Sequence, residues 1–212
     1  MPAPKVPQVH LVDDDPDVRS AVSLLLKTED FRVTAYADAQ SVLAAVDAAT
    51  PGCLVLDVRL PDMDGLTLQR ELKSRGVEMP VVFITGHGDI PMAVRAVSEG
   101  ALDFLEKPFH DGALIEGVRH ALELDAQRRA GAAEMAQVEE RLQSLTPRER
   151  QVLDKLLDGK PNKLIARDLD VSVRTVEIHR SNLMLKMGAK SPSHLARLAL
   201  ACHDFRDRLT PE

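Results

Sequence analysis

The chain has no tryptophan, and aromatic residues make up only 3% of its 212 positions, which argues against a platform that stacks single-stranded bases. Its apolar runs stay far below the ~20 residues that span a bilayer. The first residues, MPAPKVPQV, lack the apolar stretch of a secretory signal. Cys53 and Cys202 fit neither a zinc motif nor a disulfide framework. We therefore expect a cytoplasmic protein with reduced thiols and no membrane contact.

Charge is distributed unevenly along the chain, although the total is only −6. Residues 144–212 carry 13 Lys and Arg against 9 Asp and Glu, whereas residues 1–143 carry 14 against 24. Ordinary scatter explains such an asymmetry about as well as function does. A basic end after an acidic beginning is nevertheless typical of a chain whose two halves bind different partners.

The first 125 residues alternate between strand and helix patterns. Short β-rich apolar runs occupy 9–12, 32–36, 53–57, 81–85 and 101–105. Apolar residues recur at helical spacing within 18–26, 42–49, 66–72, 92–97 and 114–122. This alternation predicts an α/β fold, a doubly wound five-stranded parallel sheet covered on both faces, for example in the order 2-1-3-4-5. An eight-unit barrel is excluded because it needs ~250 residues.

The segment 123–143, ELDAQRRAGAAEMAQVEERLQ, is polar, alanine-rich and helix-prone. We interpret it as a helical linker that is broken or hinged near Gly131. One continuous helix, paired as a short coiled coil, is the alternative, but apolar residues are sparse for that arrangement.

Only helix signals follow residue 144, which predicts an all-α domain of four helices. Thr146, Pro147 and Glu149 form a capping box that begins the first helix. A short helix follows at 162–169, and Ser172 caps a third that ends at Gly188. Helix, short turn and helix in this order are typical of a helix-turn-helix, whose second helix fits the major groove. On that third helix we expect Val176, Leu183 and Met187 to form the inward stripe. The residues of the helix that are polar or face variably are Arg174, Thr175, Glu177, Ile178, Arg180, Ser181 and Lys186.

Polar residues gather at the carboxyl ends of the predicted strands. Asp13 and Asp14 follow the first strand and Asp57 ends the third, which this topology makes its neighbour. Three carboxylates repel one another unless a cation joins them, and hard oxygen ligands suit Mg²⁺. Thr85 and Lys107 follow the fourth and fifth strands. A hydroxyl, an ammonium and a metal around one carboxylate favour phosphoryl transfer to that carboxylate.

Residues 8–122 resemble a response-regulator receiver domain. The matching motifs are VDDD (12–15), LDVRLPDMDG (56–65), TGHGD (85–89) and DFLEKPF (103–109). The resemblance implies that Asp57 is the phosphoacceptor and takes its group from a phosphohistidine on a sensor histidine kinase. It also implies that Asp14, Asp57 and the backbone carbonyl of Arg59 bind Mg²⁺, with Asp13 acting through water.

The same resemblance assigns roles at the ends of the last two strands. Thr85 would hold a phosphoryl oxygen, and Lys107 would pair with the acyl phosphate. Phe104 matches the family's switch aromatic: Thr85 moves toward the phosphoryl group, Phe104 turns inward, and the face of the fourth helix, fifth strand and fifth helix favours a homodimer. Alternatively, Phe104 is simply part of the core. His87 takes no chemical step.

About residues 141–202 resemble a LuxR-type DNA-binding domain. The matching motifs are LTPRERQVL (145–153), NKLIA (162–166), SVRTVEIHR (172–180) and KMG (186–188). Pro161 stands where a small polar residue usually caps the second helix, and we expect Asn162 to take over that role. By resemblance Glu177, Ile178 and Ser181 face bases, and the phosphate contacts are Lys163, Arg174, Thr175 and Arg180.

Together these features indicate a two-component transcriptional regulator of the FixJ/NarL family. We expect a receiver at 1–122, a helical linker at 123–143 and a DNA-binding domain at 144–212. Phosphorylation would promote dimerisation and binding to paired promoter half-sites, with RNA polymerase as a further partner. Apart from its own phosphorylation and dephosphorylation, the chain would not be an enzyme.

Two other functions compete with this one. A metal-dependent phosphohydrolase of the haloacid-dehalogenase type expects a second Asp two residues after its nucleophile, where this chain has Arg59. Alternatively, the helical end binds protein or RNA instead of duplex DNA. The signal, the kinase, the operator and the regulated genes do not follow from these residues.

Overall fold

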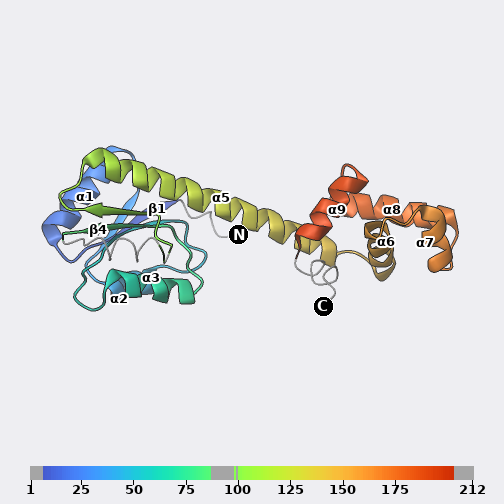
Figure 1. The fold of residues 1–212 in the computed structure, drawn as a ribbon, viewed down its shortest axis with the longest axis horizontal. Helices are drawn as coiled ribbons and strands as arrows, with labels where there is room; N and C mark the ends of the chain where they lie inside the picture. Colours follow the sequence, from blue (N-terminus) through green and yellow to red (C-terminus); the bar gives the residue numbers. More distant parts are fainter. Residues whose placement is uncertain (1–6, 87–97, 99, 203–212) are drawn as a thin grey trace. The chain divides into compact units, whose positions relative to one another are not determined.

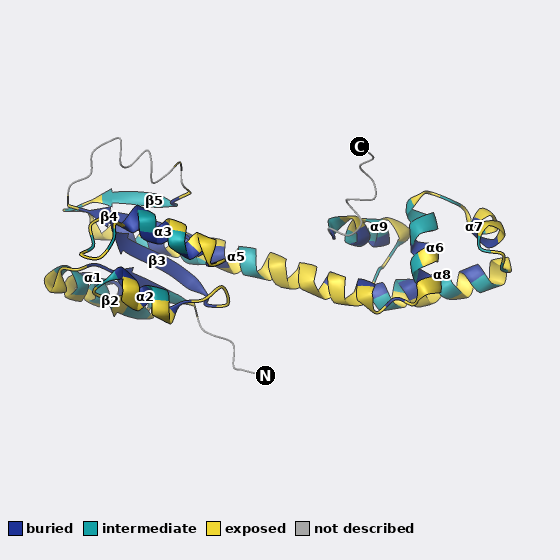
Figure 2. Cartoon of the chain, turned by 90° about the horizontal axis from the view of Figure 1, so that it is seen from below, coloured by how far each residue is buried: buried dark blue, intermediate teal, exposed yellow. Residues whose placement is uncertain are grey.

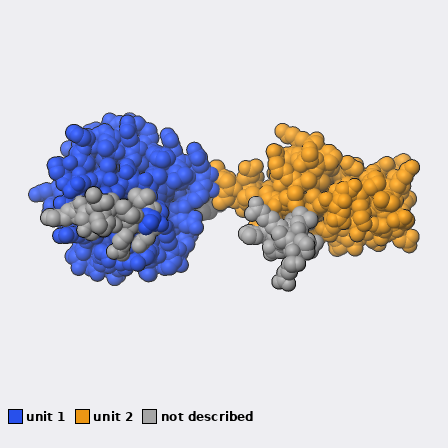
Figure 3. All heavy atoms as spheres, in the orientation of Figure 1, with its two compact units in different colours: residues 1–129 blue, residues 130–212 orange. Residues whose placement is uncertain are grey.

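The computed structural model describes residues 7–86, 98 and 100–202. The chain divides into two compact units, an N-terminal unit ending at Arg129 and a C-terminal unit beginning at Ala130 (Figure 3). The fourth helix expected at 92–97 and the expected loop residue His87 lie outside the described residues. No described helix has the length and apolarity needed to cross a membrane.

The N-terminal unit is built on a parallel sheet of five strands. Their order is β2-β1-β3-β4-β5, so the predicted fold class and strand order are confirmed. Because β1 lies between β2 and β3, the chain reverses direction across the sheet at the β1–β3 boundary. The strands are β1 (Gln8–Val12), β2 (Val33–Tyr36), β3 (Gly52–Asp57), β4 (Val81–Thr85) and β5 (Asp103–Glu106).

Helices cover both faces of this sheet (Figure 1). α1 (Pro16–Thr28) and α5 (Asp111–Gln143) cover one face, where Leu11, Leu26 and Val118 share a core. α2 (Ala39–Ala45) and α3 (Gly65–Ser74) cover the other, where Val42, Leu56 and Leu72 pack with their neighbours. Strands β3 and β4 are buried along their whole length because both faces are covered (Figure 2).

The helix α5 is 33 residues long and runs through Gly131, so the expected break there is wrong. Its neighbours are alanine, arginine, glutamate and glutamine, whose helix propensity offsets the cost of one glycine, about 1 kcal/mol. Figure 2 shows α5 exposed along its middle. A continuous helix is therefore maintained there without a tertiary contact at Gly131, around which a Cβ would meet no atom within 4 Å.

Asp125 fastens α5 to the N-terminal unit. Its carboxylate is buried and accepts hydrogen bonds from the backbone N–H of Gly52 (2.8 Å), from Arg128 (3.0 Å) and from Arg129 (2.8 Å). Arg129 also donates to the carbonyl of Thr50. α5 therefore stays bound to the N-terminal ends of the strands beyond residue 122.

The C-terminal unit contains four described helices around its own core. They are α6 (Pro147–Leu157), α7 (Asn162–Asp168), α8 (Val173–Met187) and α9 (Pro192–Ala201). Thr146 and Glu149 form the predicted capping box, and Ser172 caps α8 by accepting from the N–H of Thr175. The end of α5 contributes Val138 and Leu142 to this core.

Each unit buries one cysteine. Cys53 lies in β3 under α1 and α5, and burial raises the pKa of its thiol far above the ordinary value. Cys202 follows α9 and belongs to the core of the C-terminal unit. Neither cysteine forms a disulfide within the described residues.

Candidate functional site

The acidic loop after β1 divides its three aspartates between two tasks. Asp15 caps α1 by accepting from the N–H groups of Asp17 and Val18, and Pro16 opens the helix. Asp13 is fully buried and its Oδ1 accepts from the N–H of Asp15 at 2.9 Å. Asp14 is exposed. The first two carboxylates are thus left at the strand end while the third fixes the helix.

Asp57 ends the buried strand β3 and is held from its own loop. Its Oδ1 accepts from the N–H of Arg59 at 2.9 Å, and Asp64 caps the following helix α3. Gly65 passes close to this strand end, because a Cβ there would lie 2.5 Å from the carbonyl oxygen of Asp57. A glycine is therefore required for α3 to begin against the site.

Lys107 joins the two strand ends. Its Nζ lies 2.6 Å from Oδ2 of Asp13 and 2.6 Å from Oδ2 of Asp57, although these residues are far apart in the sequence. The backbone N–H of Lys107 donates to the carbonyl of Thr85 at 2.7 Å, which anchors the loop that carries it. The structure therefore brings together the acidic pair and the lysine that the sequence predicts for one site.

Burial and hydrogen bonding act in opposite directions on the charged groups of this pocket. Burial raises the pKa of Asp13 and outweighs the hydrogen bonds from Lys107 and Asp15, and the charge of Asp57 adds to the rise. Burial would lower the pKa of Lys107, but its hydrogen bonds to Asp13 and Asp57 outweigh that effect and raise it. Lys107 therefore stays charged while the carboxylates retain an excess of negative charge.

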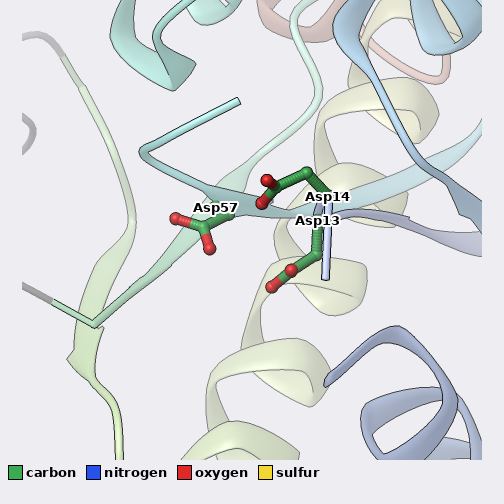
Figure 4. Close-up of side chains that lie close together, drawn as sticks. All are labelled: Asp13, Asp14 and Asp57. Carbon is green, nitrogen blue, oxygen red and sulfur yellow. The ribbon is translucent and has the colours of Figure 1, made fainter. Parts of the chain in front are cut away.

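The three aspartates meet the chemical requirements of a magnesium site. One carboxylate oxygen from each of Asp13, Asp14 and Asp57 lies within 4.8 Å of the others. Figure 4 shows the three side chains gathered at the ends of two neighbouring strands. Hard oxygen donors, two of them buried and one exposed to water, suit an ion that keeps part of its hydration shell.

Thr85 and Phe104 occupy the two strands beyond Asp57. Thr85 is fully buried at the end of β4, and Phe104 in β5 is partly buried against the core under α2 and α3. Phe104 is paired with Phe83 across the two strands. Thr85 therefore ends the strand next to that of Asp57, and the fourth helix that the switch hypothesis needs lies outside the described residues.

Two residues that the sequence analysis missed hold the loops of this pocket. Arg19 on α1 donates to the backbone carbonyls of Asp13 and Asp14, both at 2.7 Å. Asp62 accepts from the N–H groups of Ala39 (3.2 Å) and Gln40 (3.0 Å) and so ties the β3–α3 loop to the start of α2. Neither contact leaves a sequence signal, because both depend on how the loops fold back.

In the C-terminal unit, α8 separates its two faces as predicted. Val176, Leu183 and Met187 are fully buried, which confirms the predicted inward stripe. Ile178 on the outer side is 53% exposed. Of the remaining predicted DNA contacts, Arg174, Glu177 and Ser181 are exposed on α8, Thr175 is half-buried beside its cap, and Lys163 is exposed on α7.

The expected cap of α7 is wrong. Pro161 occupies the cap position without a side-chain hydrogen bond. Asn162 does not cap the helix because its Oδ1 accepts from Arg180 of α8 at 3.0 Å. The same contact engages Arg180, which the sequence analysis assigned to phosphate. Lys160, another basic residue of this region, pairs with Asp168 at 2.6 Å.

Comparison with known proteins places both units in described families. The family model described as response regulator receiver domain matches residues 9–119, and the model for bacterial regulatory proteins of the luxR family matches residues 143–199. The transcriptional regulatory protein FixJ of Rhizobium meliloti is 47% identical over 91% of this chain and 95% of its own length. The response regulator protein TodT of Pseudomonas putida is 43% identical over 90% of this chain and 84% of its own.

Solved structures agree with this assignment. The response regulator StyR superimposes with a TM-score of 0.85 at 41% identity and covers 92% of this chain and 99% of its own. Full-length FixJ from B. japonicum gives a TM-score of 0.57 at 42% identity, covering 92% and 97%. A receiver with its acidic pocket, followed by a LuxR-type helix-turn-helix, makes this chain a member of the FixJ-type transcriptional response regulators.

Proposed function

We propose that Asp57 accepts a phosphoryl group from a phosphohistidine of a sensor histidine kinase. A carboxylate oxygen of Asp57 attacks phosphorus, the P–N bond breaks, and the departing imidazole nitrogen keeps the electron pair and takes a proton. The observation that carries this proposal is the position of Lys107, 2.6 Å from both Asp13 and Asp57. One ammonium between two carboxylates leaves net negative charge at the strand ends. This charge would attract a cation, and the cation together with Lys107 would attract the phosphoryl group.

The residues around Asp57 divide the remaining work. Asp13, Asp14, Asp57 and the backbone carbonyl of Arg59 would hold Mg²⁺, which supplies charge neutralisation at the phosphoryl oxygens. Lys107 moves from its carboxylate partners to the acyl phosphate, and the Thr85 hydroxyl donates to a phosphoryl oxygen. The chain turns over no other substrate, so the chemistry ends at the acyl phosphate and its hydrolysis.

The output of this reaction is a change in dimerisation and DNA binding. Thr85 moves toward the phosphoryl group, Phe104 turns inward, and two N-terminal units associate. Two linked DNA-binding units then engage paired half-sites, because the second contact becomes intramolecular. Residues 1–122 carry the phosphoacceptor chemistry, 123–143 join the two parts, and 144–212 bind the promoter and meet RNA polymerase in the cytoplasm.

Mass spectrometry of the intact chain tests the phosphoacceptor. The wild-type chain, mixed with Mg²⁺ and acetyl phosphate or a phosphorylated kinase, is expected to gain one phosphate that base and hydroxylamine remove. The Asp57→Asn chain is the matched control and should gain none. Equal labelling of the two chains, or sustained turnover of a generic phosphate ester, would replace this proposal with a different site or with a hydrolase.

Sedimentation and duplex selection test the output. Beryllofluoride with Mg²⁺ should shift the wild-type chain from monomer toward dimer, and the Phe104→Ala chain should shift less. Unaltered dimerisation of Phe104→Ala would remove the switch role. The dimer should select a duplex with two half-sites from a random library, and failure to select any duplex would favour a protein or RNA partner.

A further inference from the structure

The helix α8 ends against residues from the preceding linker. Gly188 adopts a left-handed conformation (φ 62°) and closes the helix with N–H bonds to the carbonyls of Leu185 and Met184. The guanidinium of Arg141, near the end of α5, donates to the carbonyl of Met187 at 3.3 Å. A Cβ at position 188 would lie 3.1 Å from this guanidinium, so the glycine also provides the space that Arg141 uses.

Lys186, in the last turn of α8, is directed toward the start of α6. Its Nζ lies 2.7 Å from Oε2 of Glu149 and 3.3 Å from the carbonyl of Ser144. Glu149 is 3% exposed and also accepts from the N–H of Thr146 at 2.9 Å. Breaking this pair would leave a buried carboxylate without its cation.

The charge state of Glu149 supports a full ion pair. Burial alone would raise the pKa of Glu149, but the hydrogen bonds from Lys186 and Thr146 outweigh it and hold the pKa below its ordinary value. Val138 and Leu142 of α5 share a core with Leu183 and Met187 of α8. Packing, a helix cap and an ion pair therefore act on the same end of one helix.

We propose that Lys186 and Arg141 are positioning residues that fix the C-terminal half of α8 for reading the duplex, and that neither contacts a DNA phosphate. The inference rests on duplex binding by the C-terminal unit and is independent of phosphorylation at Asp57. It separates the cations of this unit into two groups by their partners. Exposed cations such as Lys163 and Arg174 remain for phosphates, whereas Lys186 and Arg141 hold the helix.

Salt dependence of binding distinguishes the two groups. The probe is the duplex that the wild-type chain selects from a random library, and the variants are full chains. Lys163→Met, the control for a phosphate contact, should lower the slope of log K against log salt by about 0.9. Lys186→Met should leave the slope unchanged and weaken binding about tenfold, and Glu149→Gln should do the same, since each removes one half of one ion pair.

A double variant and a conservative variant sharpen this result. Lys186→Met combined with Glu149→Gln should bind no more weakly than either single variant, because the two changes remove one interaction. Lys186→Arg should restore affinity, since a guanidinium can pair with Glu149. A lower slope for Lys186→Met together with wild-type binding by Glu149→Gln would identify Lys186 as a phosphate contact and overturn the proposal.

Amide hydrogen exchange reports on the helix itself and does not require DNA. Exchange at residues 185–189 should accelerate in Arg141→Met, Lys186→Met and Glu149→Gln while the first turn of α8 keeps its rate. Arg148→Met, in an exposed arginine of α6, is the matched control and should leave these rates unchanged. If Lys186→Met does not fold, Glu149→Gln gives the same readout with the capping-box acceptor retained.

The binding and exchange measurements distinguish a failure of the positioning role from a failure of DNA binding by the C-terminal unit. If the wild-type chain selects no duplex, DNA binding by this unit is wrong. If it selects one and the exchange rates at 185–189 do not respond to Arg141→Met, Arg141 has no positioning role. If they respond but affinity does not, the C-terminal half of α8 takes no part in reading the duplex.

Discussion

Two lysines, one in each unit, form short contacts with buried carboxylates and differ in how many they serve. Lys107 is shared between Asp13 and Asp57 at 2.6 Å each, whereas Lys186 serves Glu149 alone at 2.7 Å. The carboxyl groups differ as well: burial raises the pKa of Asp13, whereas hydrogen bonds from Lys186 and Thr146 lower the pKa of Glu149 despite its burial. Lys107 is thus a shared lysine, between two carboxylates, and Lys186 is an exclusive lysine, paired with one.

The largest effect should come from removing the shared lysine. Lys107→Met leaves two buried carboxylates facing each other, and we expect the free energy of unfolding to fall by about 4 kcal/mol at neutral pH without Mg²⁺. If Mg²⁺ binds these aspartates, it should recover more stability in the variant than in the wild type, because the variant has lost the ammonium that neutralises them. Urea unfolding with and without Mg²⁺ measures both values.

Lys186→Met is the control from the other unit. It should cost about 2 kcal/mol, less than Lys107→Met, because it leaves one buried carboxylate without its cation and one third of the Lys186 side chain is exposed. Mg²⁺ should not alter that loss. An equal response of the two variants to Mg²⁺ would remove the distinction between a shared and an exclusive lysine.

Acid should unfold the N-terminal unit first. Burial lowers the pKa of His10 from 6.5 to about 4, so between these values the unfolded chain binds the proton more tightly than the folded chain. The free energy of unfolding should therefore fall as pH drops from 6.5 toward 4, by about 3 kcal/mol in total. The lowered pKa of Glu149 means that its contribution in the C-terminal unit is lost only below its ordinary pKa, near 4.5.

Tyr36 fluorescence, from the single tyrosine of the chain, follows the N-terminal unit, and far-ultraviolet circular dichroism follows both. Asp13 acts against His10, because its raised pKa makes the folded state gain protons as pH falls. The difference between wild type and His10→Phe in the slope of the free energy of unfolding against pH therefore isolates the histidine, and this difference in slope should vanish above pH 7. An unchanged pH slope in His10→Phe would assign the acid sensitivity to another group.

A smaller loss should follow from weakening the attachment of α5. Asp125→Asn keeps an acceptor for the N–H of Gly52 but loses the charge that holds Arg128 and Arg129, and we expect a loss of about 2 kcal/mol. Urea unfolding followed by Tyr36 fluorescence measures it. Glu123→Gln, an exposed change on the same helix, should stay within about 0.5 kcal/mol. Similar values for the two variants would show that Asp125 does not fasten the helix.

The smallest effect is a gain. Gly131→Ala should stabilise the continuous helix α5 by about 1 kcal/mol, because alanine is the better helix former and meets no neighbour. Thermal unfolding followed by circular dichroism checks this, with Ala132→Gly as the opposite change. A loss of stability in Gly131→Ala would mean that this position leaves the helix.

The proximity of the residues in the acidic pocket could be predicted from the sequence, because it follows from the order of the strands in the sheet. Asp13, Asp57 and Lys107 each follow an apolar run, and the strand order alone brings such ends together. The inward residues of α8 were predictable for a similar reason, since helical period determines which side Val176 and Leu183 take.

The remaining features depend on contacts that have no local pattern. The sequence does not pair Lys186 with Glu149, because the two residues lie on different helices. Asn162 was expected to cap α7 because Pro161 cannot, but its side chain instead binds Arg180 on another helix. Gly131 was interpreted as a hinge because glycine usually interrupts a helix, whereas here its neighbours sustain one. Arg19 binds backbone carbonyls, which every residue possesses.

Each unit contains one buried thiol whose chemical labelling would report the opening of that unit. A thiol-specific reagent can reach Cys53 only when the sheet opens and Cys202 only when the helical core opens, since both are enclosed in the closed molecule. Pulses of such a reagent, with the labelled peptides counted afterwards, would time the opening of the two halves separately in one sample. Adding beryllofluoride or duplex would then show, from the slower labelling of Cys53 or Cys202, which unit each ligand stabilises against opening.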